Sequence, residues 1–217
     1  MSTTPIEHTD LGISLNQTRP ANDGDFQIEA DFAEALISSR QNISPKRLVE
    51  PGPRTDQMLS IFRAAAAAPD HGLLTPWRFV LVPQQRRDDL AEVFALSLID
   101  RDPGATLEQI ESAREKAHRA PCLLTAIARL GNSEPPIPPL ERMVSVGAAI
   151  QNILLCAHSM GFGSGLTSGQ AMQSPRMRKL FSLKEGEEAV CCINIGSVSK
   201  RKMPRARPDP SSFVSSL

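Results

Sequence analysis

Residues 39–47, SRQNISPKR, combine side chains suited to holding an anionic ligand. Arg40, Lys46 and Arg47 stand among short amide and hydroxyl side chains. A guanidinium group binds phosphate through paired hydrogen bonds, and amide side chains can hydrogen-bond the edge of a heterocycle. The segment is therefore either a site for a phosphate-bearing ligand or a polar loop in contact with solvent.

Residues 161–169, GFGSGLTSG, form a second candidate. Four glycines in nine residues leave the backbone amides accessible, and this allows a phosphate or a planar ring to approach closely. The segment lacks the Gly-Lys-Ser/Thr ending of a P-loop and the third glycine of a dinucleotide-binding fingerprint, and it is expected to follow a helix instead of a strand. It is either a cofactor loop or only the end of a helix with a tight connection.

Residues 68–77, APDHGLLTPW, close a run of five alanines. Pro69 ends the alanine helix because proline lacks an amide hydrogen and its ring clashes with the preceding turn. Asp70 and His71 follow, so the stretch is either a plain helix end before a strand or a binding loop. Trp77 is expected to pack as a structural residue.

The cysteines and histidines do not predict a metal site. All four cysteines stand among aliphatic residues without the paired two-residue spacing of zinc or redox sites, so we expect buried apolar thiols at Cys122, Cys156, Cys191 and Cys192. The four histidines show no short metal-ligand spacing either. No nucleophile motif of the type Gly-x-Ser-x-Gly occurs.

The elements that must position these segments follow from periodicity and from the prolines. Helices are predicted at residues 30–40, from a cap at Thr55 or Asp56 to Pro69, and at 85–99, 106–118, 140–161 and 174–181, the last with Ser174 as its cap. Strands are predicted at residues 77–83, 122–130 and 187–196, and a fourth remains open. Because helices and strands do not alternate regularly, the pattern favours an α+β fold. Residues 1–27 are predicted to be a flexible arm, and residues 28–217 a single domain with a C-terminal tail.

The longest predicted helix, residues 140–161, carries apolar residues around nearly its whole circumference. Such a helix is buried on all sides, either in a large core or between subunits. Gly147, Ala148 and Ala149 would let a second helix approach closely. We expect a homodimer formed through this helix, with a central helix in a monomer as the alternative.

Composition limits the class of protein. The chain of 217 residues is 41% hydrophobic and 22% charged, as expected of one globular domain or one protomer of an intimate oligomer. A formal net charge of zero offers no field that would attract nucleic acid or an anionic membrane. No signal sequence or spanning apolar run is recognised, so the cytoplasm is the expected compartment.

Two long segments resemble the signature segments of the nitroreductase family. They are RAAAAAPDHGLLTPWRFVLVP and GAAIQNILLCAHSMGFGSGLTSG, in the right order and at the right separation. The segments SRQNISPKRLVEPGP and RPDPSSFV fit the small NAD(P)H nitroreductase branch of that family. The resemblance covers about residues 30–215. It implies an α+β, nitroreductase-like fold, with a central mixed or antiparallel sheet flanked by helices. It also implies an intertwined homodimer that binds one FMN at each of two interface sites, with the C-terminal segment extending across the partner.

The resemblance also assigns a flavin site by position. Residues 40–42 would hold the flavin phosphate, ribityl chain or ring edge, and residues 166–168 would pass beside the isoalloxazine. Asp70 and His71 would meet the flavin from the other subunit, with His71 either touching the flavin or closing its own loop. A cation among residues 200–202 would complete the phosphate site. The full set is Arg40, Gln41, Asn42, Asp70, His71, Leu166, Thr167, Ser168, Lys200, Arg201 and Lys202.

The chain departs from the family pattern at two places. Several relatives carry Arg-Arg-Ser where this chain has Arg40-Gln41-Asn42, and some carry Arg where this chain has Ala67. The site therefore loses positive charge, which would weaken flavin binding unless Lys46 or Arg47 replaces it.

The activity implied by the resemblance is that of an FMN-dependent oxidoreductase with no catalytic side chain of its own. It would take hydride from NADH or NADPH and reduce a nitroaromatic, a quinone or a similar small acceptor in a ping-pong sequence. Two alternatives stay open. One is a flavin enzyme of the same fold that uses oxygen or another acceptor, of the flavin-fragmenting or dehalogenase type. The other is a helical interaction module without enzymatic activity.

Overall fold

The computed structural model describes residues 23–131, 136–201, 203 and 206–216. It divides into two units, residues 1–35 and 36–217. The described part of the first unit belongs to helix α1 (Asp23–Ser39), which begins earlier than predicted. The helix therefore includes residues 23–27 of the predicted arm. Residues 1–22 of the predicted arm lie outside the described residues.

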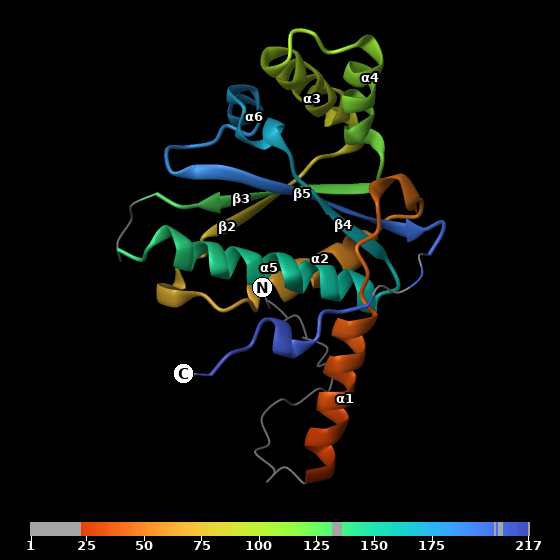
Figure 1. The fold of residues 1–217 in the computed structure, drawn as a ribbon, viewed down its shortest axis with the longest axis vertical. Helices are drawn as coiled ribbons and strands as arrows, with labels where there is room; N and C mark the ends of the chain where they lie inside the picture. The colour runs from red at the N-terminus through yellow and green to blue at the C-terminus, as the bar shows by residue number, and fades with distance from the viewer. Residues whose placement is uncertain (1–22, 132–135, 202, 204–205, 217) are drawn as a thin grey trace, which may run out of the picture. The chain divides into compact units, whose positions relative to one another are not determined.

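The second unit is built on an antiparallel sheet of five strands (Figure 1). They are β1 (Leu48–Val49), β2 (Trp77–Leu81), β3 (Cys122–Arg129), β4 (Gly163–Thr167) and β5 (Glu187–Val198). The long strand β5 pairs with β1, β3 and β4, and β2 adds to the far side of β3. The register places Leu124 opposite Ile193 and Ala126 opposite Cys191. The expected sheet is therefore confirmed in its antiparallel form.

Strands β1 and β4 were missed by the sequence prediction. β1 is only two residues long. β4 lies in the glycine-rich segment that the sequence predicts as a loop, because glycine is rare in strands. That loop assignment is wrong for residues 163–167, which pair with β5 from Gly163 opposite Gly196 to Thr167 opposite Cys192.

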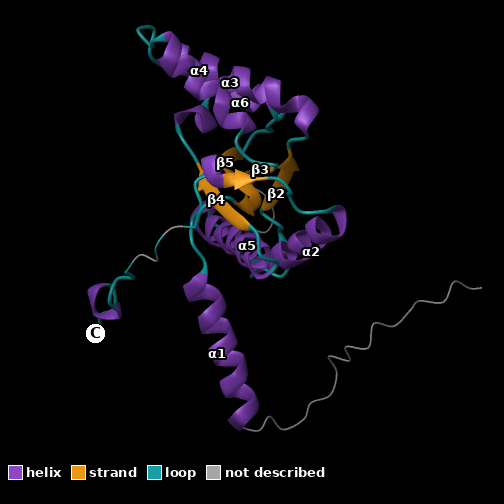
Figure 2. Ribbon diagram, turned by 90° about the vertical axis from the view of Figure 1, so that its right-hand side faces the viewer, coloured by secondary structure: helices purple, strands orange, loops and turns teal. Residues whose placement is uncertain are grey.

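Helices cover both faces of the sheet (Figures 1 and 2). α2 (Thr55–Ala66) and α5 (Pro139–Ser159) pack on one face. α3 (Arg87–Arg101), α4 (Leu107–Glu115) and α6 (Pro175–Leu180) lie on the other. Ser174 caps α6 by accepting a hydrogen bond from Met177 N, as predicted. The cap of α2 is Arg54 instead of Thr55 or Asp56.

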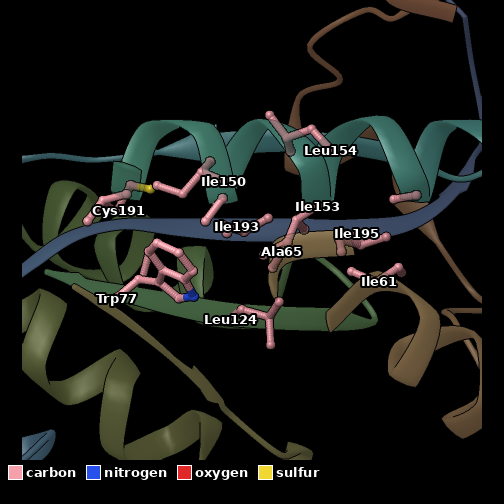
Figure 3. Close-up of a cluster of buried hydrophobic side chains, with 14 of the residues drawn as sticks. Ile61, Ala65, Trp77, Leu124, Ile150, Ile153, Leu154, Cys191, Ile193 and Ile195 are labelled. Carbon is pink, nitrogen blue, oxygen red and sulfur yellow. The ribbon is translucent and has the colours of Figure 1, made fainter. Parts of the chain in front are cut away.

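The larger core lies between β2, β3, β5 and the helices α2 and α5. Ile61 and Ala65 of α2, Ile153 of α5, Leu124 and Ile193 meet there with almost no exposed surface (Figure 3). Trp77 is 7% exposed within the same cluster, which confirms its structural role. A second apolar cluster, which includes Leu90, Leu123 and Met177, joins α3 and α6 to the opposite face of the sheet. Together the clusters fix the positions of β4 and of the loops at its ends.

The chain itself covers only one side of α5. Val146, Ala149, Ile150 and Ile153 are buried. Leu140 and Val144 are 83% and 70% exposed, and Gly147 is exposed as well. Burial on all sides is therefore not reached within the described part of one chain, and the homodimer stays a prediction. Among the described helices α5 alone has the length and apolar character of a membrane span, but its buried side packs on α2 and the sheet as a core helix.

The cysteines are free thiols. Cys122, Cys191 and Cys192 are buried as predicted, and burial raises the pKa of Cys122 and Cys191 to about 11. Cys156 is only partly buried. Of the residues that the structure describes, no group of three His, Cys, Asp or Glu side chains could hold a metal ion.

Candidate functional site

The polar segment after α1 and the C-terminal end of α5 form a small pocket of about 100 Å³. We call it the Arg40 pocket. It brings together two segments that the sequence singled out separately, because Asn42 forms a parallel β-bridge with Ser164 of β4. The pocket is lined by Ser39, Arg40, Gln41, Ile43, His158, Gly161, Phe162, Gly163, Ser164, Val198 and Arg201.

The Arg40 pocket is positively charged. Arg40 and Arg201 line it, and the Arg207 guanidinium donates from Nη2 to the Arg40 carbonyl oxygen at 2.9 Å. Burial and then the charge of Arg207 lower the pKa of Arg40. Burial, followed by the charges of Arg40 and Arg201, likewise lowers the pKa of His158. No acidic residue is among the described residues that line the pocket, so the arrangement favours an anion.

Two buried polar atoms in the pocket have no hydrogen-bond partner within the described chain. They are Arg40 Nε and Ser164 Oγ. Buried donors are rarely left unpaired, because the lost hydrogen bonds to water cost roughly 1–3 kcal/mol and more for a charged group. His158 is partly satisfied, since its Nε2 lies 2.9 Å from Ser39 Oγ. The two unpaired atoms are where a bound anion would be held.

Strand β4 leads from this pocket to an exposed edge. Gly165 lies so close to the preceding segment that an added Cβ would come within 2.1 Å of the Ile43 carbonyl oxygen. Asn42 Oδ1 accepts a hydrogen bond from Leu166 N at 3.2 Å, so this side chain holds the strand in place. Beyond it, Leu166, Thr167 and Ser168 are exposed.

The predicted loop residues Asp70 and His71 lie elsewhere in the protomer and line neither this pocket nor the larger cavity described below. Asp70 accepts hydrogen bonds from Leu74 N at 3.2 Å and Thr75 N at 2.6 Å, which folds the loop back on itself. The exposed His71 ring pairs through Nδ1 with Glu141 in the first turn of α5. A contact of either residue with a flavin held by another subunit stays a prediction.

The cations expected at the phosphate site differ in whether they line the Arg40 pocket. Arg201 lines the Arg40 pocket, whereas Lys200 is exposed and does not line it. Lys202 lies outside the described residues. Lys46 and Arg47, considered as substitutes for the missing family arginine, do not line the pocket either. Arg207 takes a position beside Arg40 instead.

Sequence reasoning gave no role to three polar residues that line the pocket, Ser39, His158 and Ser164, or to Arg207 beside it. The first three stand at a helix end or within the glycine-rich segment, where their types gave no signal of their own. Arg207 was one of several basic residues in a proline-rich tail, and only its hydrogen bond to Arg40 distinguishes it.

Residues 46–197 match the sequence model of the nitroreductase family. The chain belongs to the nitroreductase family. Among relatives, it is 31% identical over 185 residues to the Escherichia coli protein named "Putative NAD(P)H nitroreductase YdjA", covering 85% of this chain and 98% of the relative. The match therefore includes nearly the whole length of that relative.

Solved structures confirm the nitroreductase-like α+β fold. A nitroreductase-like family protein from Bacillus cereus superposes with a TM-score of 0.73 at 18% identity, covering 84% of this chain and 94% of that one. A nitroreductase from Bacteroides fragilis with bound FMN superposes with a TM-score of 0.63 at 18% identity, covering 84% and 96%. At this sequence identity the superpositions show only that the folds are alike.

The residues present fit FMN. The Arg40 pocket, at about 100 Å³, is too small for a ring system but large enough for a phosphate, which Arg40, Arg201 and the unpaired Ser164 Oγ would hold. From Ser164 to Thr167 the strand advances about 10 Å at the usual rise per residue. The exposed edge at residues 166–168 therefore lies where the ring end of a flavin anchored by its phosphate would extend.

Proposed function

We propose that the protein is an FMN-dependent oxidoreductase that takes hydride from NAD(P)H and reduces a small organic acceptor. The observation that carries the proposal is the Arg40 pocket, in which cations and unpaired buried donors converge and no described carboxylate opposes them. Membership in the nitroreductase family and the FMN bound by the Bacteroides fragilis relative support it.

In this proposal the side chains of the protein bind and orient. Arg40, Arg201 and Ser164 hold the phosphate, and Asn42 fixes β4 so that residues 166–168 line the ring. Bound FMN would supply the redox chemistry, accepting hydride from NAD(P)H and passing electrons to the acceptor. Donor and acceptor would use the same exposed face in turn, which is a ping-pong sequence.

We further propose that the protein acts as a homodimer. Leu140, Val144 and Gly147 form an exposed stripe along α5. They recur at intervals of four and three residues and therefore share one side of the helix. A second copy of the chain would cover this stripe and would bring Asp70 and His71 of that copy toward the flavin. We place the protein in the cytoplasm, where NAD(P)H is supplied.

The test of the flavin site is flavin retention in Arg40→Ala. The wild-type protein should purify yellow, with FMN released on denaturation. Arg40→Ala should bind FMN roughly 10–100-fold more weakly, because charge-assisted hydrogen bonds to the phosphate are lost. Arg63→Ala is the matched control, since Arg63 is exposed on α2 and lines neither cavity. Equal FMN content in the Arg40 and Arg63 variants would contradict the assignment.

The acceptor is tested by following NADH and NADPH oxidation. A nitroaromatic, a quinone and oxygen are each supplied as the sole oxidant. Reduction of the organic acceptors at rates well above that with oxygen supports the proposed reductase, and the reverse order would assign the protein to the oxygen-using flavin enzymes of the fold.

A further inference from the structure

A second, larger cavity of about 370 Å³ lies at the other end of the exposed β4 edge. Residues of α3, of α4 and of the segment 167–172 line it. Figures 1 and 2 show α3 and α4 on the face of the sheet opposite α5. We call it the Lys116 pocket. Its volume falls within the range typical of small-molecule sites. Thr167 and Ser168, expected beside the flavin ring, belong to its lining, so it adjoins the place where redox chemistry would occur.

Three cations line the Lys116 pocket: Arg101, Lys116 and Arg119. Its lining, all within the described chain, includes no carboxylate. Arg119 donates to the Ser112 carbonyl oxygen at 3.3 Å and lies 3.5 Å from Glu115. Arg101 and Lys116 form no ion pair with any residue that the structure describes.

Neighbouring arginines behave differently. Arg114 pairs with Glu92 at 2.6 Å, and Arg176 pairs with Asp100 at 2.6 Å. These two arginines are thus paired with carboxylates, whereas Arg101 and Lys116 of the cavity are not so paired in the described chain. Arg101 and Lys116 have no carboxylate partner among the described residues, so an anion in the cavity could accept charge-assisted hydrogen bonds from them.

Part of the wall of the Lys116 pocket is apolar. Phe94 and Leu98 of α3 and Leu123 of β3 contribute to it. An apolar wall with a few convergent charged groups is the usual design of a site for a ring that carries a charged substituent. The space beside Gly169 in the lining of the cavity is free, because an added Cβ there would meet nothing within 4 Å.

We propose that the Lys116 pocket binds the anionic group, carboxylate or phosphate, of the co-substrate that reacts at the flavin. The ring or planar part of this co-substrate would lie between Phe94 and residues 167–168. The inference rests on the proposed flavin-dependent function and adds to it a preference for anionic over neutral co-substrates. Lys116 would be the main residue that binds the anionic group.

The first test is direct binding to the purified protein by isothermal titration. The probes are benzoate and its neutral analogue benzyl alcohol, neither of which can be reduced by transfer of hydride from a flavin in this assay. Lys116→Gln should weaken benzoate binding about tenfold, the loss of one charge-assisted hydrogen bond, and leave benzyl alcohol unchanged. Lys179→Gln, an exposed lysine of α6 outside the cavity, is the matched control. Lys116 makes no ion pair in the described chain, so its loss should not affect folding.

The second test is kinetic and identifies the source of the anion. In a ping-pong sequence the kcat/KM of the donor and that of the acceptor are independent of each other. A tenfold fall in kcat/KM for 4-nitrobenzoate, with 4-nitrobenzyl alcohol unchanged, supports the proposal with the acceptor as the anion. A fall confined to NADH and NADPH supports it with the phosphates of the donor.

Three results would overturn the proposal. One is unchanged benzoate affinity together with unchanged kcat/KM for every substrate. Another is an equal fall in kcat/KM for charged and neutral acceptors, because Lys116 would then not distinguish anionic from neutral substrates. The third is loss of FMN from Lys116→Gln, which would assign the cations to the flavin itself. A colourless wild-type protein would instead contradict the proposed function, while the benzoate titration would still test anion binding in the Lys116 pocket.

Discussion

His158, at the end of α5, lies near Arg40 and Arg201. Its pKa therefore depends on whether the Arg40 pocket contains an anion. Burial and the charges of Arg40 and Arg201 lower its pKa from the ordinary value of 6.5. In the ligand-free protein the ring is therefore neutral at pH 7. A bound phosphate would offset both arginine charges and favour the imidazolium form.

We expect FMN to raise the pKa of His158. The sign follows from the charges: the free pocket repels a proton, and an anion attracts one. NMR titration of the histidine ring protons with and without FMN measures the shift directly, and His158→Gln assigns the resonance. An unchanged pKa on saturation with FMN would place the phosphate outside this pocket.

Single residues show how far the sequence leads. Arg40 was singled out because arginine next to short polar residues is a chemical signal, whereas Arg201 was one of three cations that only the family resemblance suggested. His158 and Arg207 carried no such signal, since their roles depend on the approach of α5 and of the C-terminal tail to residue 40. Asp70 was predicted as a flavin contact, but in the protomer its two oxygens are occupied by backbone amides of its own loop. Local sequence cannot report contacts made by distant segments.

Strand β4 links the two pockets, and Gly165 is the position where it can least tolerate a side chain. An added Cβ would lie 2.1 Å from the Ile43 carbonyl oxygen. That backbone cannot move freely, because Ile43 N donates to the Ser164 carbonyl oxygen at 2.9 Å. The close approach explains why the strand contains glycine despite the low strand propensity of this residue.

We expect Gly165→Ala to destabilise the protein by roughly 1–3 kcal/mol, as other overpacked sites do, and to reduce FMN content. Gly169→Ala is the matched control. Its backbone is extended, with φ 179°, and a Cβ there meets nothing within 4 Å, so its stability should stay unchanged. Thermal denaturation and flavin content of both variants provide the measurement. Equal melting temperatures would show that residues 42–43 and β4 are not held as closely as described.

The elements differ in how well their sequences predict them. Helix α6 was predicted with its cap because Ser174-Pro175 is a local start signal that the fold retains. Strands β2, β3 and β5 were predicted from continuous apolar runs bounded by turn residues. β4 was not, because its glycines serve a tertiary contact and oppose the local propensity. Elements whose residues satisfy local rules were found, whereas the two-residue strand β1 and the glycine-containing strand β4 were missed.

At the scale of the whole molecule, the described residues leave the apolar stripe of Leu140, Val144 and Gly147 on α5 exposed. Sequence periodicity indicated a helix buried on all sides, whereas in the described chain only one side of α5 is buried. Apolar side chains that stay exposed along a core helix favour association with another surface. A second copy of the chain presents the same stripe, as a two-fold interface requires.

We therefore expect Val144→Glu to convert a dimer into a monomer and to lower FMN content at the same time. Glutamate is a good helix former, so α5 should persist while its apolar stripe gains a charge that is costly to bury. Leu107→Glu is the control, because Leu107 is 81% exposed at the start of α4, away from the stripe. Size-exclusion chromatography with light scattering, together with the flavin spectrum, reads both properties. A wild-type monomer that retains FMN would refute the interfacial site, since the Arg40 pocket of one chain would then suffice. A monomeric Val144→Glu protein that has lost its flavin would show that the second subunit completes the site.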